Sequence, residues 1–267
     1  MGRLAQAFAR AHGENRAALV AYLCAGDPDL ATTTRLIRAA ADAGADVIEV
    51  GMPFSDPTAD GPVIQRASER ALAAGTTLAG VFDAIRRVRE DSDVAIVLFG
   101  YYNPILSRGE ARAVAEASAA GVDGFLVVDL PPEEATTLTQ FLRARDMDFV
   151  PLVAPTTADE RVDVIARSAD SFLYYVSLTG VTGAETDLRA AARRAIAVRT
   201  RTHKPVAVGF GVKTPADVRA IAAGAGGVDG VVVGSAICTA IEAAASPDAA
   251  VAAVSALVAS LRSACVR

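Results

Sequence analysis

The chain has 267 residues, of which 52% are hydrophobic and 5% aromatic, and its formal net charge is -5. This acidic balance argues against a surface that binds nucleic acid or an anionic membrane. The length suits one large domain covering residues 1–267, and an α/β barrel typically needs about 250 residues.

The cysteines and the chain ends indicate a cytoplasmic protein. Cys24, Cys238 and Cys265 lack metal-ligand spacing, and an odd number without a pairing pattern is typical of a reducing cytosol. The first residues lack the apolar core of a signal peptide, and the apolar stretch 249–261 is too short to span a bilayer.

Short apolar, β-branched segments alternate with amphipathic helical segments along the whole chain. After a first helix at 4–11, the predicted strands lie at 18–24, 46–50, 94–99, 123–128, 148–153, 171–176, 205–208 and 228–233. The predicted helices between and after them lie at 32–43, 62–74, 77–89, 109–120, 133–145, 158–167, 187–198, 215–223, 236–244 and 247–261.

These strand-helix units predict an α/β fold: a single (β/α)8 TIM barrel with an extra N-terminal helix and additional helices after strands 2 and 8. A closed barrel fits eight units better than an open doubly wound sheet. Three helix-to-strand joins repeat one pattern, with glycine at the helix end and Asp46, Asp123 or Asp229 just before the strand.

In such barrels the catalytic groups lie where strands end and the following loops begin. These positions here are Glu49, Asp60, Tyr101, Tyr102, Asn103, Asp129, Tyr174, Thr182 and the late glycines.

Glu49 is an acid inside an apolar strand. Strand alternation turns Ile48 and Val50 toward the helices, so Val47, Glu49 and Gly51 face the barrel interior. Loss of water there would raise the pKa of Glu49, which suits a general acid near neutral pH. The alternative is a structural glutamate held by buried hydrogen-bond donors.

Asp60 stands just before Gly61 and Pro62, which predict a helix start because proline is favoured at the first helical position. It is a second candidate acid on the same loop. The alternative is a structural aspartate stabilised by the free N–H groups and dipole of that helix. Asp56 is an ordinary turn residue before Pro57.

Glycine turns follow the last three predicted strands, at 180–183, 209–211 and 234–235. Glycine lets backbone N–H groups approach an anion, and a helix that starts at Ser235 adds its dipole. Barrels often bind phosphate with the loops after strands seven and eight. Together the turns predict a phosphate site, although each could be a plain turn.

Other common chemistries find little support in the sequence. No His and Cys cluster suits zinc, and no Gly-x-Ser-x-Gly elbow occurs. Lys204 and Lys213 are the only lysines and neither lies within a strand, which disfavours a Schiff-base aldolase and leaves Lys213 as the residual candidate.

The segment 48–62, Ile-Glu-Val-Gly-Met-Pro-Phe-Ser-Asp-Pro-Thr-Ala-Asp-Gly-Pro, resembles the signature of the tryptophan synthase alpha-subunit family. The resemblance covers essentially the whole chain. Further motifs occur in the family's order at 25–28, 102–104, 128–132, 180–183, 209–211 and 234–235.

The resemblance implies a metal-free retro-aldol cleavage of indole-3-glycerol phosphate to indole and glyceraldehyde 3-phosphate. By resemblance, Glu49 protonates the indole ring carbon, and Asp60 engages the indole N–H and stabilises the positive charge of the tautomer. Tyr174 would help to position Glu49 and the substrate. Thr182 matches a loop that in the family closes over Asp60. The implied indole pocket is Tyr22, Phe99, Asp129 and Val153, and the implied phosphate site is Gly183, Phe210, Gly211, Gly234 and Ser235.

The resemblance also implies a partner. The loops around Asp56-Pro57 and Asn103-Pro104 would face a beta subunit in an alpha2beta2 heterotetramer. Pyridoxal phosphate would belong to that beta partner, so we expect no cofactor on this chain. The sequence departs from the commoner pattern at three positions, which bear on pocket fit and loop closure: Tyr22, Cys24 and Thr58 stand where Phe, Thr and an aliphatic residue are frequent.

Three alternatives remain open from sequence. The chain could be a free-standing indole-3-glycerol phosphate lyase, a different barrel acting on a sugar phosphate, or a non-catalytic subunit that only activates a beta partner. The presence of both acids argues against the last.

Overall fold

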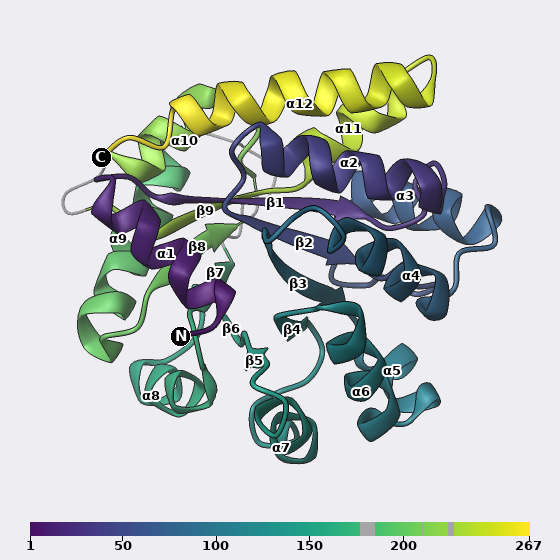
Figure 1. The fold of residues 1–267 in the computed structure, drawn as a ribbon. Helices are drawn as coiled ribbons and strands as arrows, with labels where there is room; N and C mark the ends of the chain where they lie inside the picture. The colour runs from purple at the N-terminus through teal and green to yellow at the C-terminus, as the bar shows by residue number, and fades with distance from the viewer. Residues whose placement is uncertain (177–184, 210, 224–226) are drawn as a thin grey trace.

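The computed structural model describes residues 1–176, 185–209, 211–223 and 227–267. Within these residues, nine parallel strands form one curled sheet in the order β5-β4-β3-β2-β1-β9-β8-β7-β6, and helices surround it (Figure 1). The strands are β1 (Ala18–Cys24), β2 (Val47–Gly51), β3 (Ala95–Gly100), β4 (Gly124–Val127), β5 (Asp148–Phe149), β6 (Leu152–Val153), β7 (Leu173–Val176), β8 (Val206–Gly209) and β9 (Gly230–Val233).

The ring of strands closes through the segment 148–153. β5 pairs with β4 and β6 pairs with β7. Between them, Val150 donates its N–H to Phe125 at 2.9 Å and the carbonyl of Pro151 accepts from Tyr174 at 3.0 Å. The sequence predicted one strand here, and the structure has two, because proline has no N–H to continue the ladder. The predicted barrel is otherwise confirmed.

The helices match the predicted ones within a few residues, with one addition. They are α1 (Arg3–Gly13), α2 (Leu30–Asp42), α3 (Pro62–Ala73), α4 (Leu78–Val88), α5 (Tyr102–Arg108), α6 (Glu110–Ala120), α7 (Thr136–Arg143), α8 (Asp159–Ser168), α9 (Glu185–Thr202), α10 (Pro215–Ala222), α11 (Ser235–Glu242) and α12 (Pro247–Ser263). The sequence missed α5 because Pro104 suggested a loop, yet a proline in the first helical turn removes no intrahelical bond.

Side chains alternate between two apolar clusters, as predicted. Ile48 and Val50 belong to a cluster between sheet and helices, whereas Val47 belongs to a second cluster inside the barrel. Glu49 therefore faces inward, since successive side chains in a strand point to opposite faces.

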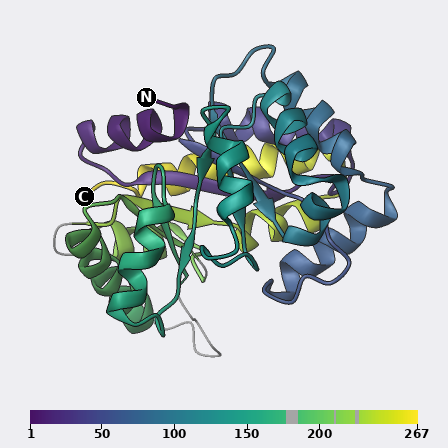
Figure 2. The same cartoon turned by 90° about the horizontal axis from the view of Figure 1, so that it is seen from below.

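Helix α1 closes the amino-terminal end of the barrel (Figures 1 and 2). The Phe8 ring lies 4.7 Å from that of Phe172, centroid to centroid. A Cβ atom at Gly124 or Gly230 would lie 3.0 Å from Leu4 or Phe8, so glycine at the first position of β4 and β9 leaves room for the helix. This agrees with the predicted helix across one end.

The repeated Gly and Asp joins bind the amino-terminal ends of the strands. Asp46 accepts the N–H of Leu19 at 2.9 Å and a bidentate ion pair from the buried Arg16 at 2.5 and 2.8 Å. Asp123 and Asp229 repeat the device, each joining a backbone N–H of the neighbouring strand and an arginine. Their partners are Ile96 and Arg89 for Asp123, and Val206 and Arg199 for Asp229.

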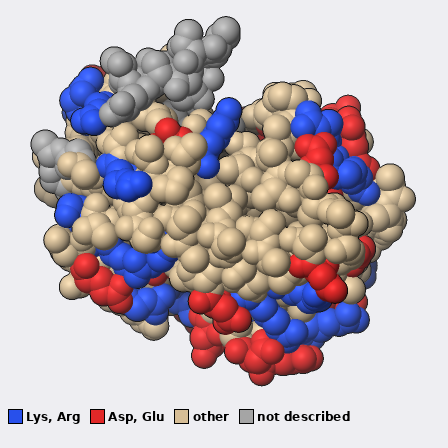
Figure 3. Space-filling model, turned by 90° about the horizontal axis from the view of Figure 1, so that it is seen from above, with Lys and Arg blue, Asp and Glu red and all other residues tan. Residues whose placement is uncertain are grey.

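The face that carries α12 mixes both signs of charge around a largely uncharged centre (Figure 3). One ion pair there joins Arg35 of α2 to Asp248 of α12 at 2.5 Å. Among the described helices, none has both the length and the apolar character that a membrane crossing requires.

Candidate active site

The two acids that the sequence singled out lie at the same end of the barrel. Glu49 is in β2, opposite Tyr22 of β1 in the parallel register. Asp60 ends the loop between β2 and α3 and accepts a hydrogen bond from Tyr101, the residue that follows β3. Because β2 and β3 are paired neighbours, both acids lie near the carboxyl edge of the sheet.

Glu49 is fully buried without a hydrogen-bond donor. Its exposed fraction is 0%, and neither carboxyl oxygen has a partner among the described residues. Burial raises the pKa of Glu49 from 4.5 to about 8. The structural alternative, a glutamate held by buried donors, therefore has no support in the described part of the chain, and the acid is protonated at neutral pH.

Asp60 turns away from the helix that follows it. Gly61 caps α3 without any side-chain hydrogen bond, so Asp60 does not cap this helix. Its Oδ2 accepts from the Tyr101 hydroxyl at 3.1 Å, and its Oδ1 is buried without a partner among the described residues. Burial raises the pKa of Asp60 to about 6 and the Tyr101 hydrogen bond lowers it, so the carboxylate is mostly ionised at pH 7.

Two tyrosines occupy the space above glycines at strand ends. A Cβ at Gly51 would lie 2.4 Å from the Tyr22 hydroxyl, and one at Gly209 would lie 2.0 Å from the Tyr174 hydroxyl. The Tyr22 ring also packs edge-on against Phe99, with centroids 5.1 Å apart. Glycine at these two positions is therefore what lets both rings lie across the barrel.

Both carboxyl groups, those of Glu49 and Asp60, affect the pKa of both tyrosines. Burial is the main cause that raises the pKa of Tyr174 far above its usual value, and the charges of Glu49 and Asp60 add to it. Burial likewise dominates the raised pKa of Tyr22, with smaller contributions from two cysteines, Asp60 and Glu49. The acids thus share one buried region with the predicted pocket aromatics.

An apolar rim surrounds this region. Five partly buried residues pack against the interior cluster: Val63, Ile64, Val128, Leu152 and Val176. The sequence assigned Val153 to this pocket, and that assignment is wrong. Val153 pairs with Tyr175 and lies in the helix-side cluster, whereas Leu152 pairs with the inward-facing Tyr174. Alternation counted from Tyr174 would have identified Leu152.

Asp129 lies at the same carboxyl edge of the sheet, but its side chain accepts a hydrogen bond from the backbone. Its Oδ1 accepts the N–H of Tyr102 at 2.8 Å, which satisfies a free donor at the start of α5. The side chain is exposed rather than turned into the barrel. Its predicted place in the indole pocket stays a prediction.

Three of the residues predicted to bind phosphate, Gly211, Gly234 and Ser235, lie in the described part of the chain. β8 and β9 are paired neighbours, which brings Gly211 and the turn at Gly234-Ser235 to adjacent strand ends. Gly211 has a φ of +79°, and Gly234 immediately precedes α11. Backbone N–H groups at such a helix start can hold an anion. The remaining predicted residues, Thr182, Gly183 and Phe210, lie outside the residues that the structure describes.

Ion pairs connect the two helices that begin at the site. Arg66 and Arg70 of α3 each lie 2.8 Å from Glu242 at the end of α11. Arg70 also pairs at 2.8 Å with the buried Asp27, after β1. These ion pairs thus join α3, which follows Asp60, to α11, which begins beside Gly234, one of the predicted phosphate-binding residues.

The predicted partner-facing residues lie on the surface beside Asp60. Asp56 and Asn103 are exposed, and Pro57 and Pro104 are partly buried. A hollow of about 500 Å³ borders this surface, lined by Phe54, Ser55, Asp56, Pro57, Thr58, Gln65, Glu69 and Leu72. Leu106 of α5 is 53% exposed and lies in the same helix as Asn103 and Pro104.

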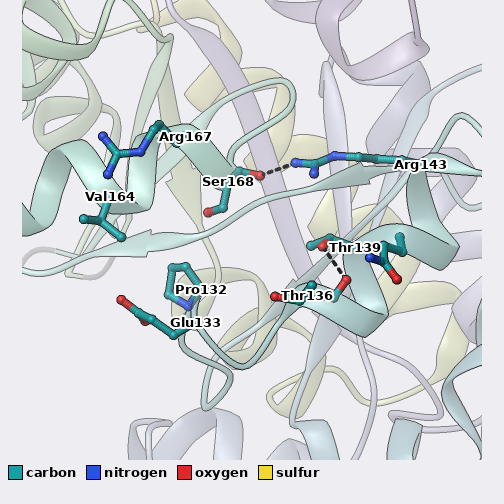
Figure 4. Close-up of a pocket in the computed structure, with 9 residues that line it drawn as sticks. Pro132, Glu133, Thr136, Thr139, Arg143, Val164, Arg167 and Ser168 are labelled. Atoms are coloured by element: carbon teal, nitrogen blue, oxygen red, sulfur yellow. Dashed lines mark hydrogen bonds between the residues drawn. The ribbon is translucent and has the colours of Figure 1, made fainter.

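A separate groove of about 330 Å³ runs between α7 and α8 in the helix layer (Figure 4). Arg143 donates to the Ser168 carbonyl at 3.1 Å and pairs with Asp170 at 3.0 Å, while Glu133 pairs with Arg161. These charged groups form ion pairs with one another, and neither Glu49 nor Asp60 lines the groove.

Within the described residues, no group of three or more His, Cys, Asp or Glu side chains could hold a metal ion. Lys213, the residual Schiff-base candidate, is exposed in the loop before α10. The arrangement pairs a protonated acid with an ionised one at the same end of the barrel, which suits acid-base chemistry on a bound molecule.

Comparisons with known proteins agree with this geometry. A family model described as tryptophan synthase alpha chain matches residues 8–266. The tryptophan synthase alpha chain of Geobacter sulfurreducens is 52% identical over 238 residues, 89% of each chain. That of Burkholderia lata is 47% identical over 266 residues, 99% of this chain and 97% of the relative. A crystal structure of tryptophan synthase subunit alpha from Legionella pneumophila has a TM-score of 0.88 at 37% identity, covering 99% of this chain and 98% of that one.

Proposed function

The chain belongs to the tryptophan synthase alpha chain family, a lyase subunit of tryptophan biosynthesis, and we propose that it cleaves indole-3-glycerol phosphate to indole and glyceraldehyde 3-phosphate. The observation that carries the proposal is the pair of acids. Glu49 is buried, without a donor among the described residues, and protonated at neutral pH, while Asp60 at the same barrel end is mostly ionised.

Glu49 acts as the general acid. It donates its proton to the indole ring carbon that carries the glycerol side chain, which weakens the bond between them. As that bond breaks, its electron pair returns to the ring, and the neighbouring hydroxyl loses its proton to become the aldehyde. After donating its proton, Glu49 is a carboxylate that can accept the proton of this hydroxyl. Glu49 is then protonated again, and no net proton is gained or lost.

Asp60 stabilises the charge that this protonation creates. The ring nitrogen becomes positively charged in the tautomer, and a carboxylate that accepts its N–H interacts more strongly with that state than with neutral indole. The free Oδ1 of Asp60 supplies the acceptor. Tyr22, Phe99, Leu152 and Tyr174 supply apolar surface for the ring.

The phosphate group binds at the late glycines. We assign Gly211, Gly234 and Ser235 to it from their strand-end positions, and Gly183 and Phe210 from family membership. Thr182 is assigned to the loop that covers Asp60 on the same ground. Closure of such a loop would exclude water from the reacting groups.

The alpha chain role implies a beta-chain partner, and we propose an alpha2beta2 assembly. We assign the docking face to the surface that contains Asp56, Pro57, Asn103, Pro104 and Leu106. Pyridoxal phosphate is assigned to the beta chain, and this chain needs no cofactor for the cleavage described above.

An assay of the purified chain tests the proposal. We expect release of indole and glyceraldehyde 3-phosphate in equal amounts from indole-3-glycerol phosphate, and stimulation of that rate by a tryptophan synthase beta chain. Isomerisation of other sugar phosphates without indole release would refute the proposal. Binding to the beta chain with no cleavage would indicate a non-catalytic subunit, and full cleavage without any beta binding would indicate a free-standing lyase.

A further inference from the structure

Tyr101 holds the loop between β2 and α3 through both its hydroxyl and its ring. The hydroxyl oxygen accepts the N–H of Ala59 at 2.9 Å and donates to Asp60 Oδ2 at 3.1 Å. The ring lies 5.1 Å from that of Phe54, centroid to centroid, and Tyr101 is buried. One side chain therefore contacts the loop near its beginning and at its end.

This arrangement gives the two carboxyl oxygens of Asp60 different hydrogen-bonding states. A tyrosine hydroxyl has one hydrogen, and the Ala59 N–H already occupies a lone pair of its oxygen, so the hydrogen is directed at Asp60. Oδ2 is thereby engaged, while Oδ1 is buried without a partner among the described residues. Turning the carboxyl group would break the Tyr101 bond, which keeps Oδ1 available for a substrate N–H.

The same side chain reaches the surface expected to meet the beta chain. Asp56 and Pro57 lie between Phe54 and Ala59 in the loop. On its other side, Tyr101 immediately precedes α5, which contains Asn103 and Pro104. Tyr101 is thus in contact with the loop that contains one segment and adjacent in the chain to the other.

We propose that Tyr101 is a positioning residue that fixes the orientation of Asp60 and ties it to the two partner-facing segments. The proposal rests on the function proposed above, because it deepens the role given to Asp60. It assigns no contact between Tyr101 and the substrate.

The neighbouring tyrosine provides a matched control. Tyr102 donates its hydroxyl to Glu110 at the start of α6, at 3.1 Å, and so lies outside the Asp60 loop. Tyr101→Phe and Tyr102→Phe each remove one hydroxyl and keep the ring. The other titratable groups near Asp60 are unchanged in both variants: Glu49, Tyr22, Cys24 and Tyr174.

The first measurement is backbone amide exchange over residues 53–61 in the substrate-free chain. Loss of a hydrogen bond should accelerate exchange about fivefold in Tyr101→Phe, and leave it unchanged in Tyr102→Phe. This readout does not depend on activity. If exchange is faster in Tyr101→Phe but the wild type releases no indole, the proposed function is refuted and the loop contact is kept. If Tyr101→Phe and Tyr102→Phe exchange at the same rate, the positioning role is overturned.

The second measurement is the steady-state rate of indole release against pH. For Tyr101→Phe we expect kcat to fall about tenfold with KM changed less than about twofold, since the lost contact orients a group that acts in the transition state. Because the Tyr101 hydroxyl lowers the pKa of Asp60, its removal should also move the acid limb to higher pH. A wild-type kcat and acid limb in Tyr101→Phe would overturn the proposal.

The third measurement adds a tryptophan synthase beta chain in excess. We expect its stimulation of indole release to be smaller in Tyr101→Phe than in the wild type. Equal stimulation in the two proteins would overturn the link to the partner-facing segments.

Discussion

Asp46, just before strand β2, and Glu49, within that strand, are both buried acids, with exposed fractions of 3% and 0%. Asp46 has a bidentate arginine and a backbone N–H, whereas Glu49 has no partner in the described part of the chain. The difference shows how two buried acids on one segment can have opposite tasks. Just before the strand a paired carboxylate joins neighbouring strands, and within the strand a carboxyl group without a partner among the described residues keeps its proton.

The largest expected effect is the loss of activity when Glu49, rather than Asp46, is replaced by its amide. Glu49→Gln removes the proton donor, and we expect kcat for indole release to fall about 10²–10⁴-fold. Asp46→Asn should change kcat less than about twofold in protein that is still folded. Steady-state assays of both variants make the comparison, and a Glu49→Gln enzyme with more than half of the wild-type kcat would break it.

Stability should respond in the opposite way. Asp46→Asn leaves the buried Arg16 without its bidentate partner, and we expect the free energy of unfolding to fall by about 3 kcal/mol. Urea denaturation followed by circular dichroism measures this loss. If Asp46→Asn and Glu49→Gln destabilised the chain equally, the contrast between the paired and the unpaired acid would not hold.

A smaller effect appears in the pH dependence of stability. The pKa of Glu49 is about 8 when folded and 4.5 ordinarily, so the folded chain keeps a proton that the unfolded chain loses. The free energy of unfolding should therefore decrease as pH rises through this window, by about 1.4 kcal/mol per pH unit from this group. Glu49→Gln removes that slope. Denaturation at pH 6.5 and 7.5 checks it, and parallel slopes in wild type and variant would contradict the raised pKa.

The smallest effect belongs to an exposed pair. Glu133 and Arg161, at the groove between α7 and α8, have side chains 50% and 42% exposed. We expect Glu133→Gln to lower the free energy of unfolding by less than about 1 kcal/mol, because water screens exposed ion pairs. Urea denaturation measures this change as well. A loss of unfolding free energy as large as that of Asp46→Asn would show that burial does not determine how much an ion pair stabilises this chain.

Local sequence patterns predicted the features that depend on neighbouring residues, such as the facing of strand side chains and the start of a helix. Alternation placed Glu49 inside the barrel, and Gly61-Pro62 marked the start of α3. What the patterns missed depends on contacts between distant segments. Nothing in the spacing of Tyr101 and Asp60, 41 positions apart, indicates their hydrogen bond.

The other misses have similar physical causes. Leu152 was confused with Val153 because two apolar neighbours look alike until a paired strand sets the register. Strand 148–153 was predicted whole because its break depends on the missing N–H of Pro151. The sequence patterns therefore predicted which acid faces the site, but not which side chains hold it there.

The pH dependence of kcat/KM for indole release tests both acids in one experiment. The assignment of Glu49 as proton donor and Asp60 as carboxylate predicts a bell-shaped profile, rising through about pH 6 as Asp60 ionises and falling through about pH 8 as Glu49 loses its proton. A profile that stays flat from pH 5 to pH 9, or one that keeps its alkaline limb in Glu49→Gln, would contradict it.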